Sequence, residues 1–79
     1  MTNSEKLISA FSVSLIITED KILDGLSYQS IPEWDSVSHM VLITEIEDSF
    51  DISLDTEDVI DLSSVLKAKE ILSKFNIEF

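Results

Sequence analysis

The 79-residue chain contains no cysteine, one glycine and one proline. The absence of cysteine excludes disulfides and cysteine-ligated zinc, and it permits a reducing compartment. No apolar run approaches the roughly 20 residues that are needed to span a bilayer. The first residues, MTNSEKLISA, lack the basic start and the long apolar segment of a signal peptide. We therefore expect one domain over residues 1–79 that is soluble and cytoplasmic.

Arginine is also absent, and five lysines stand against 16 aspartates and glutamates, so the formal net charge is −11. Ten of these acids lie between Glu33 and Leu66, a segment without any lysine. Such a charge disfavours binding to nucleic acid and to anionic membranes, and it favours a basic protein partner. The simpler interpretation is a solvated acidic face that keeps the protein soluble.

Apolar residues recur at helical spacing over most of the chain, which predicts an all-α fold, a small bundle of three to four helices. Thr2 and Glu5 fit a capping box for the first helix, and no strand-like alternation competes. Four segments are expected to be helical: 3–17, 36–50, 56–61 after a cap at Asp55 or Thr56, and a last helix that opens after Ser63 or Ser64.

Residues 18–35 lose this periodicity and contain the only glycine and the only proline, so they predict a long loop with one helical turn near residues 22–26. A loop of this length inside a small domain is unusual unless it is functional or pinned. The apolar side chains expected to pin it are Ile22, Leu23, Leu26, Tyr28, Ile31 and Trp34.

The predicted helix over residues 36–50 has two different faces. At 100° per residue, the side expected to face the core carries His39, Leu42, Ile43, Ile46 and Phe50. The opposite side carries Val37, Val41, Thr44 and Asp48, flanked by Glu45, Glu47 and Asp51. An apolar ridge that begins beside a serine and is bordered by acids indicates a docking surface.

Asp35 and Ser36 stand side by side at the start of this helix, where only one cap is needed. If Asp35 is the cap, Ser36 takes the first helical position and its hydroxyl is free and exposed. A phosphate group attached there would lie beside unpaired N–H groups and the positive end of the helix dipole. The alternative is that Ser36 is itself the cap and has no other role.

The segment WDSVSHMVLITEIEDSFDISLDTEDVIDLSSVLKAKEIL resembles the acyl carrier protein family. The resemblance runs without a gap from Asp35 to Leu72, and the first helix and the long loop fit the same fold. Asp35-Ser36-Val37 stands in place of the family's Asp-Ser-Leu, and Ile46, Glu47, Asp48 and Phe50 form the end of the same helix. The acidic segment 55–62 follows, and Ser63-Ser64-Val65 begins the last helix.

Three positions qualify this resemblance. Val37 replaces the usual leucine, and Thr44 lies where a larger apolar residue is common on the docking face. Trp34 before Asp35 is similar to a subset of stand-alone carriers outside mainstream fatty-acid synthesis.

The resemblance implies a carrier rather than an enzyme. Ser36 would bear a covalent 4′-phosphopantetheine arm, attached by a phosphopantetheinyl transferase, with Asp35 as the helix cap beside it. The thiol of the arm would hold an acyl or aminoacyl group as a thioester, in fatty-acid or secondary-metabolite biosynthesis. Loading and transfer enzymes with basic surfaces would dock on a monomer, at Val37, Met40, Val41, Thr44, Glu45, Glu47, Asp48 and Asp51.

Other classes of function fit less well. Ser36 and His39 suggest a hydrolase dyad, but the sequence has no Gly-x-Ser-x-Gly elbow and identifies no orienting third residue. His39 is better interpreted as a half-buried helix residue at the mouth of a cargo cavity. A calcium loop that starts at Asp48 fails on ligand spacing, so no metal is expected. The remaining alternative is an unmodified acidic helical module that binds a basic protein.

Overall fold

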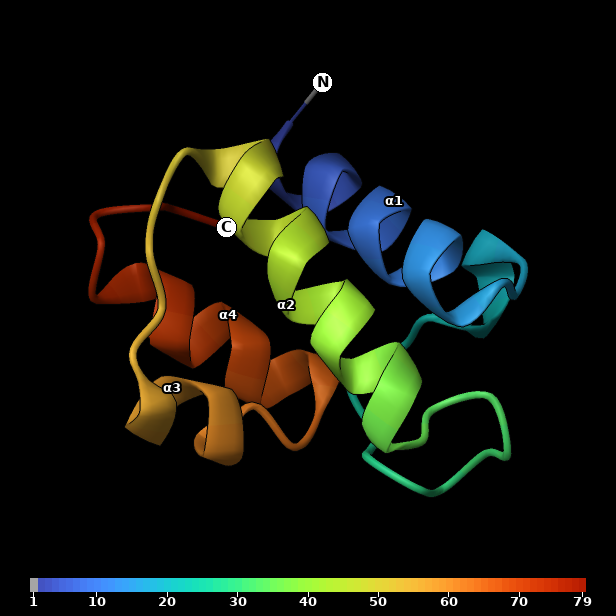
Figure 1. The fold of residues 1–79 in the computed structure, drawn as a ribbon. Coiled ribbons are helices and arrows are strands. Elements are labelled where there is room, and N and C mark those ends of the chain that lie inside the picture. Colours follow the sequence, from blue (N-terminus) through green and yellow to red (C-terminus); the bar gives the residue numbers. More distant parts are fainter. Residues whose placement is uncertain (1) are drawn as a thin grey trace.

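The structure is a computed structural model that describes residues 2–79. Most of these residues are helical. Within that range there are four α-helices and no β-strand (Figure 1), which confirms the small all-α fold. The elements are α1 (Asn3–Leu15), the short 3₁₀ helix η1 (Glu19–Lys21), α2 (Ser36–Phe50), α3 (Thr56–Asp61) and α4 (Val65–Ser73).

Each α-helix begins at a polar side chain that accepts a backbone N–H of the first turn. Thr2 and Glu5 form the expected capping box of α1. Asp55 caps α3, and Ser64 rather than Ser63 caps α4. These caps satisfy donors that have no partner inside the helix, so they fix where each helix starts.

The first helix ends earlier than expected. It stops at Leu15, because Ile16 adopts the left-handed conformation with φ 55° and closes the helix. The apolar pattern continues through Ile16 and Ile17, and this made the predicted range 3–17 too long. A β-branched residue is unusual in the left-handed region, so periodicity gives no warning of the turn.

The loop between α1 and α2 corrects two expectations. Its helical turn is η1, over Glu19–Lys21, and not near residues 22–26. Leu23 is 67% exposed and pins nothing, whereas Ile22 and Trp34 are buried. Three further side chains of the loop pack partly buried against the core, Leu26, Tyr28 and Ile31.

Backbone hydrogen bonds attach this loop to the beginning of α4. The N–H of Tyr28 donates to the carbonyl of Ser63 at 2.8 Å, and the N–H of Val65 donates to the carbonyl of Leu26 at 3.0 Å. Ser27 and Ser64 form an isolated antiparallel bridge between these two contacts. The attachment brings Tyr28 close to the connection between α3 and α4, and Trp34 then leads directly into α2.

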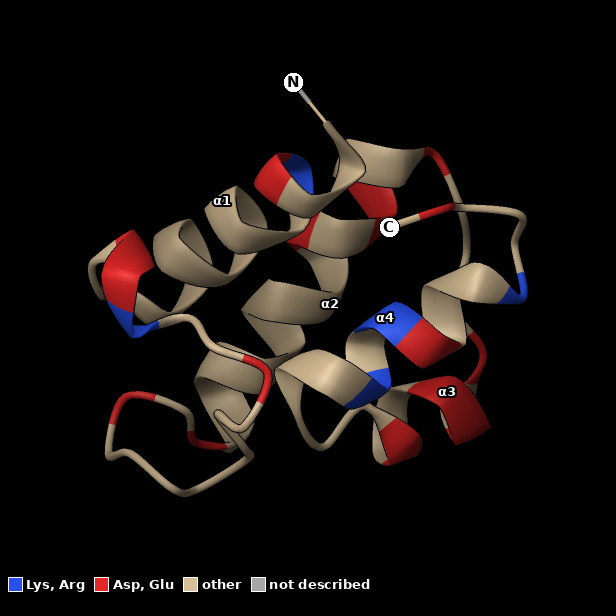
Figure 2. Cartoon of the chain, turned by 180° about the vertical axis from the view of Figure 1, so that it is seen from behind, with Lys and Arg blue, Asp and Glu red and all other residues tan. Residues whose placement is uncertain are grey.

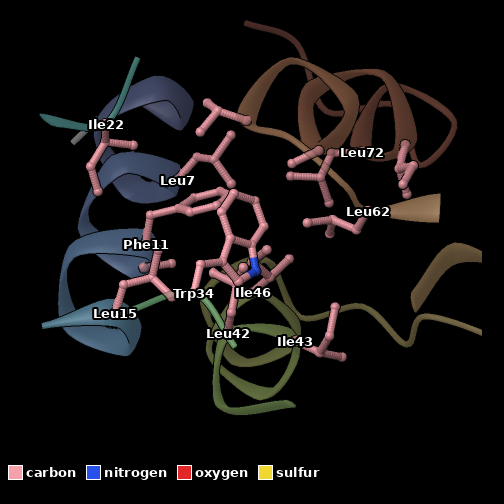
Figure 3. Close-up of a cluster of buried hydrophobic side chains, with 14 residues drawn as sticks. Leu7, Phe11, Leu15, Ile22, Trp34, Leu42, Ile43, Ile46, Leu62 and Leu72 are labelled. Carbon is pink, nitrogen blue, oxygen red and sulfur yellow. The ribbon is translucent and has the colours of Figure 1, made fainter. Parts of the chain in front are cut away.

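The core lies between α1, α2 and α4, with Trp34 at its centre (Figure 3). Trp34 is fully buried, and its ring meets Phe11 of α1 edge to face at 5.3 Å between centroids. Leu42 and Ile46 of α2 and Leu72 of α4 point into the same region (Figure 3). Among the described residues, no helix has the length and apolar character that a membrane crossing requires.

Candidate functional site

Asp35, and not Ser36, caps the start of α2. Its Oδ1 accepts the N–H of Ser38 at 2.9 Å, so Ser36 is the first helical residue. Ser36 is exposed, as expected. The hydrogen bond from the Ser38 N–H lowers the pKa of the Asp35 carboxyl below its ordinary value, which keeps the cap ionised at neutral pH.

The Ser36 hydroxyl is not free, which corrects one expectation. Its Oγ lies 3.0 Å from the hydroxyl of Tyr28, and either oxygen can donate in this hydrogen bond. The pattern around Ser36 gave no sign of this partner, because Tyr28 lies eight residues earlier in the loop. The two side chains come together where the loop folds back, with the Gln29 N–H donating to the Trp34 carbonyl, and where it attaches to α4.

Behind this pair, Trp34 and His39 form a hydrogen-bonded link to α3. The indole Nε1–H of Trp34 donates to Nδ1 of His39 at 3.0 Å. Because an indole only donates, Nδ1 carries no proton, and Nε2–H donates to the carbonyl of Val59 at 2.8 Å. Both ring nitrogens are therefore occupied away from Ser36, which argues against a Ser36–His39 dyad.

A cavity of about 240 Å³ opens beside this link. Its walls come from the long loop, α2, α3 and the connection to α4, and they consist of Tyr28, His39, Val59, Ile60, Leu62 and Ser63. Tyr28 contacts Ser36 through its hydroxyl and also lines the cavity, so this one side chain connects the serine to the cavity. His39 is half-buried and lines the cavity, as expected from its place on α2.

The outward face of α2 is apolar near Ser36. Val37 is 74% exposed, Met40 56% and Val41 46%. Thr44 and Asp48 continue the exposed face along the helix. The three fully buried positions, Leu42, Ile43 and Ile46, lie on the other side, so the two-faced pattern of this helix is confirmed.

The acidic residues around this face differ in their exposure and in whether they already form hydrogen bonds. Asp48 and Asp51 are exposed, and Asp51 closes α2 in the left-handed conformation. Glu45 is half-buried. Glu47 is the exception among the expected docking residues, because its carboxylate accepts the N–H of Leu54 at 2.7 Å and holds the loop to α3. The Glu47 carboxylate therefore has a structural role in the fold.

Sequence reasoning missed the part of the site that α3 supplies. Val59 and Ile60 form one wall of the cavity, and Ile60 is 75% exposed. The signal in the sequence was Ile60, an apolar residue in a short acidic helix that the core does not need.

Comparison of the chain with protein-family models, with curated proteins and with solved structures finds no match.

Proposed function

We propose that this chain is an acyl carrier protein, which bears a 4′-phosphopantetheine arm on Ser36 and presents an acyl group to partner enzymes. The observation that carries the proposal is the exposed Ser36 hydroxyl at the start of an Asp35-capped helix, beside an apolar cavity. When bound, the arm supplies a flexible tether with a thiol that holds the acyl group as a thioester. The chain itself catalyses no reaction.

The residues at the start of α2 fit a phosphodiester. An anion on Ser36 would lie at the positive end of a 15-residue helix, where the first-turn N–H groups favour negative charge. The Tyr28 hydroxyl adds a donor from outside the helix. In the transfer, Ser36 Oγ attacks the pantetheine-bearing phosphorus of coenzyme A and forms a new O–P bond. The bond from that phosphorus to the bridging oxygen of the diphosphate breaks, adenosine bisphosphate leaves with that oxygen, and the serine proton passes to a base of the transferase.

The cavity supports an uncharged cargo rather than an aminoacyl group. No lysine, arginine, aspartate or glutamate is among the described residues that line it, and both ring nitrogens of His39 are already hydrogen-bonded, to Trp34 and to the Val59 carbonyl. An ammonium group would lose its hydration there without gaining a counter-ion. A dry cavity of about 150 Å³ accepts a benzene molecule, so a volume of about 240 Å³ has room for at least part of an apolar acyl group.

The outward face of α2 is the proposed docking surface for the transferase and for loading and transfer enzymes. Val37, Met40 and Val41 offer apolar contact next to Ser36. Asp48 and Asp51 attract basic surfaces and steer encounter. Any enzyme that reaches Ser36 must come close to this face, because Ser36 is the first residue of the same helix.

The deciding experiment is intact mass after incubation with a phosphopantetheinyl transferase and coenzyme A. Wild type should gain one phosphopantetheine, and Ser36→Ala should gain none. Ser36→Ala should keep its helical circular dichroism, because Asp35 still caps α2. Ser38→Ala is the matched control, since it removes a neighbouring hydroxyl and keeps the backbone donor, and it should be modified fully.

An unchanged mass of the wild type would favour the alternative, an unmodified acidic module that binds a basic protein. Modification of Ser36→Ala at another serine would overturn the assignment of Ser36.

A further inference from the structure

Tyr28, the only tyrosine of the chain, joins the Ser36 site to the cavity. Its ring packs edge to face with Trp34 at 6.3 Å and lies tilted against His39 at 5.4 Å. Its backbone N–H is bound to the Ser63 carbonyl. Because the ring and the backbone are both held, the fold fixes the hydroxyl next to Ser36.

The hydrogen bond between Tyr28 and Ser36 must change character when Ser36 is esterified. With a free serine, each oxygen can donate or accept. Esterification removes the serine hydrogen, so Tyr28 becomes the only donor of the pair. A phosphodiester is also negatively charged, and hydrogen bonds to charged acceptors are roughly twice as strong as neutral ones. The Tyr28 hydroxyl therefore favours the modified chain over the unmodified chain.

The contacts of Tyr28 continue to other residues that line the cavity. Its ring rests on Trp34 and His39, and His39 donates to the carbonyl of Val59 in α3. Tyr28, His39 and Val59 all line the cavity. A Tyr28 side chain that is held more firmly at Ser36 would restrain this whole wall.

Building on the proposed carrier function, we propose that Tyr28 is a positioning residue that binds the phosphodiester at Ser36 and couples modification of Ser36 to ordering of the cavity wall at His39 and Val59. Tyr28 acts through its hydroxyl, and the ring transmits the effect. This role affects the stability and the order of the modified protein, and both can be measured without an assay of a partner enzyme.

The test compares wild type and Tyr28→Phe, each unmodified and fully modified as shown by intact mass. Tyr28→Phe keeps the ring contacts and removes only the hydroxyl. Modification should raise the melting temperature of wild type by about 4–8 °C more than that of Tyr28→Phe. The indole N–H resonance of Trp34, the only tryptophan, should shift on modification of wild type and should move much less in Tyr28→Phe.

Two further measurements make the result decisive. Ser73→Ala removes a hydroxyl that donates to the Lys69 carbonyl at 2.8 Å on α4, and it should keep the wild-type increase. In wild type alone, amide hydrogen exchange in α3 should slow on modification, which tests the coupling even if Tyr28→Phe folds poorly.

Equal increases in wild type and Tyr28→Phe, or unchanged exchange in α3, would overturn the role of Tyr28 while the carrier function stands. Failure of wild type to gain mass would instead overturn the carrier function, and this inference with it.

Discussion

The helices α2 and α4 both bury an apolar side against the core, but they differ in how they use their charges. Every lysine on or directly after α4 lies within ion-pair distance of an acid: Lys67 with Glu70 at 3.6 Å, Lys69 with Asp24 at 2.8 Å and Lys74 with Asp58 at 3.3 Å. Within residues 2–79, the exposed acids Asp48 and Asp51 of the α2 region form no ion pair.

The lysines of the chain lie on α1, on η1 and on or directly after α4, while α2 and α3 carry acids without lysine (Figure 2). Pairs at the surface stabilise a fold only slightly, so the pairs of Lys67 and Lys69 add little beyond local neutrality, while Lys74 pairs with the buried Asp58. The difference teaches that α4 pairs its charges within the molecule, whereas α2 leaves an apolar and acidic face exposed.

The largest expected effect separates buried from outward apolar residues. Leu72 of α4 is fully buried, and Val41 of α2 is 46% exposed. Leu72→Ala should lower the free energy of unfolding by about 2–5 kcal/mol, because it removes core contacts and leaves a cavity. Val41→Ala should change it by no more than about 0.5 kcal/mol. Urea denaturation followed by circular dichroism measures both values.

A loss of stability in Val41→Ala as large as that in Leu72→Ala would show that the outward face of α2 belongs to the core. The comparison between the two helices would then fail.

The next effect tests whether the acids of α2 act locally or through overall charge. Glu45→Lys with Asp48→Lys should slow phosphopantetheinyl transfer roughly tenfold at low salt, with less effect at high salt, because rim charges steer encounter and salt screens them. Glu47 is left in place, since its carboxylate holds the N–H of Leu54. Transfer rates at several salt concentrations, with circular dichroism as a check of folding, measure the effect.

The matched control is Glu70→Lys with Glu78→Lys, at two positions outside α2, one on α4 and one near the C-terminus. Each reversal adds two units of charge, so either pair changes the formal net charge from −11 to −7. The control breaks only the exposed contact between Lys67 and Glu70. If both pairs slow transfer equally, overall charge explains the effect and α2 has no special role.

The helices and the caps were largely predictable from the sequence, because both depend on local patterns. The range of α2 and its two faces follow from residues within a few positions of one another, whereas the sequence left both Asp35 and Ser36 open as its cap and the structure shows Asp35. The bounds of α3 follow in the same way. The end of α1 did not, because the left-handed turn at Ile16 interrupts a pattern that continues through it.

The site was predictable only in part, because its remaining contacts join distant segments. The Tyr28–Ser36 hydrogen bond depends on how the long loop folds back on Trp34 and attaches to the start of α4. The His39–Val59 bond depends on how α3 lies against α2. The turn of Glu47 toward Leu54 depends on the shape of the connection after α2. Periodicity places a residue on a face and does not identify its partner across the molecule.

The smallest expected effect comes from the way the two helices begin, because Asp35 caps α2 with a carboxylate and Ser64 caps α4 with a hydroxyl. The Ser38 N–H lowers the pKa of Asp35 below its ordinary value of 3.8. A carboxyl with a lowered pKa in the folded state stabilises the fold fully above that ordinary value. This contribution is lost as the pH falls through the folded-state pKa.

Asp35→Ser, which replaces one good cap by another that does not titrate, should therefore melt slightly below wild type at neutral pH. The difference in melting temperature between wild type and Asp35→Ser should become smaller as the pH falls. Melting temperatures at about pH 6 and about pH 3 avoid the sequence pI of about 4.1, where the protein carries little charge. Ser64→Ala serves as the reference, since its loss of about 0.5–2 kcal/mol involves no titrating group and should be similar at both pH values. A gap for Asp35→Ser that stays constant between the two pH values would show that the charge of Asp35 adds nothing to its cap, and the two helices would then begin in the same way.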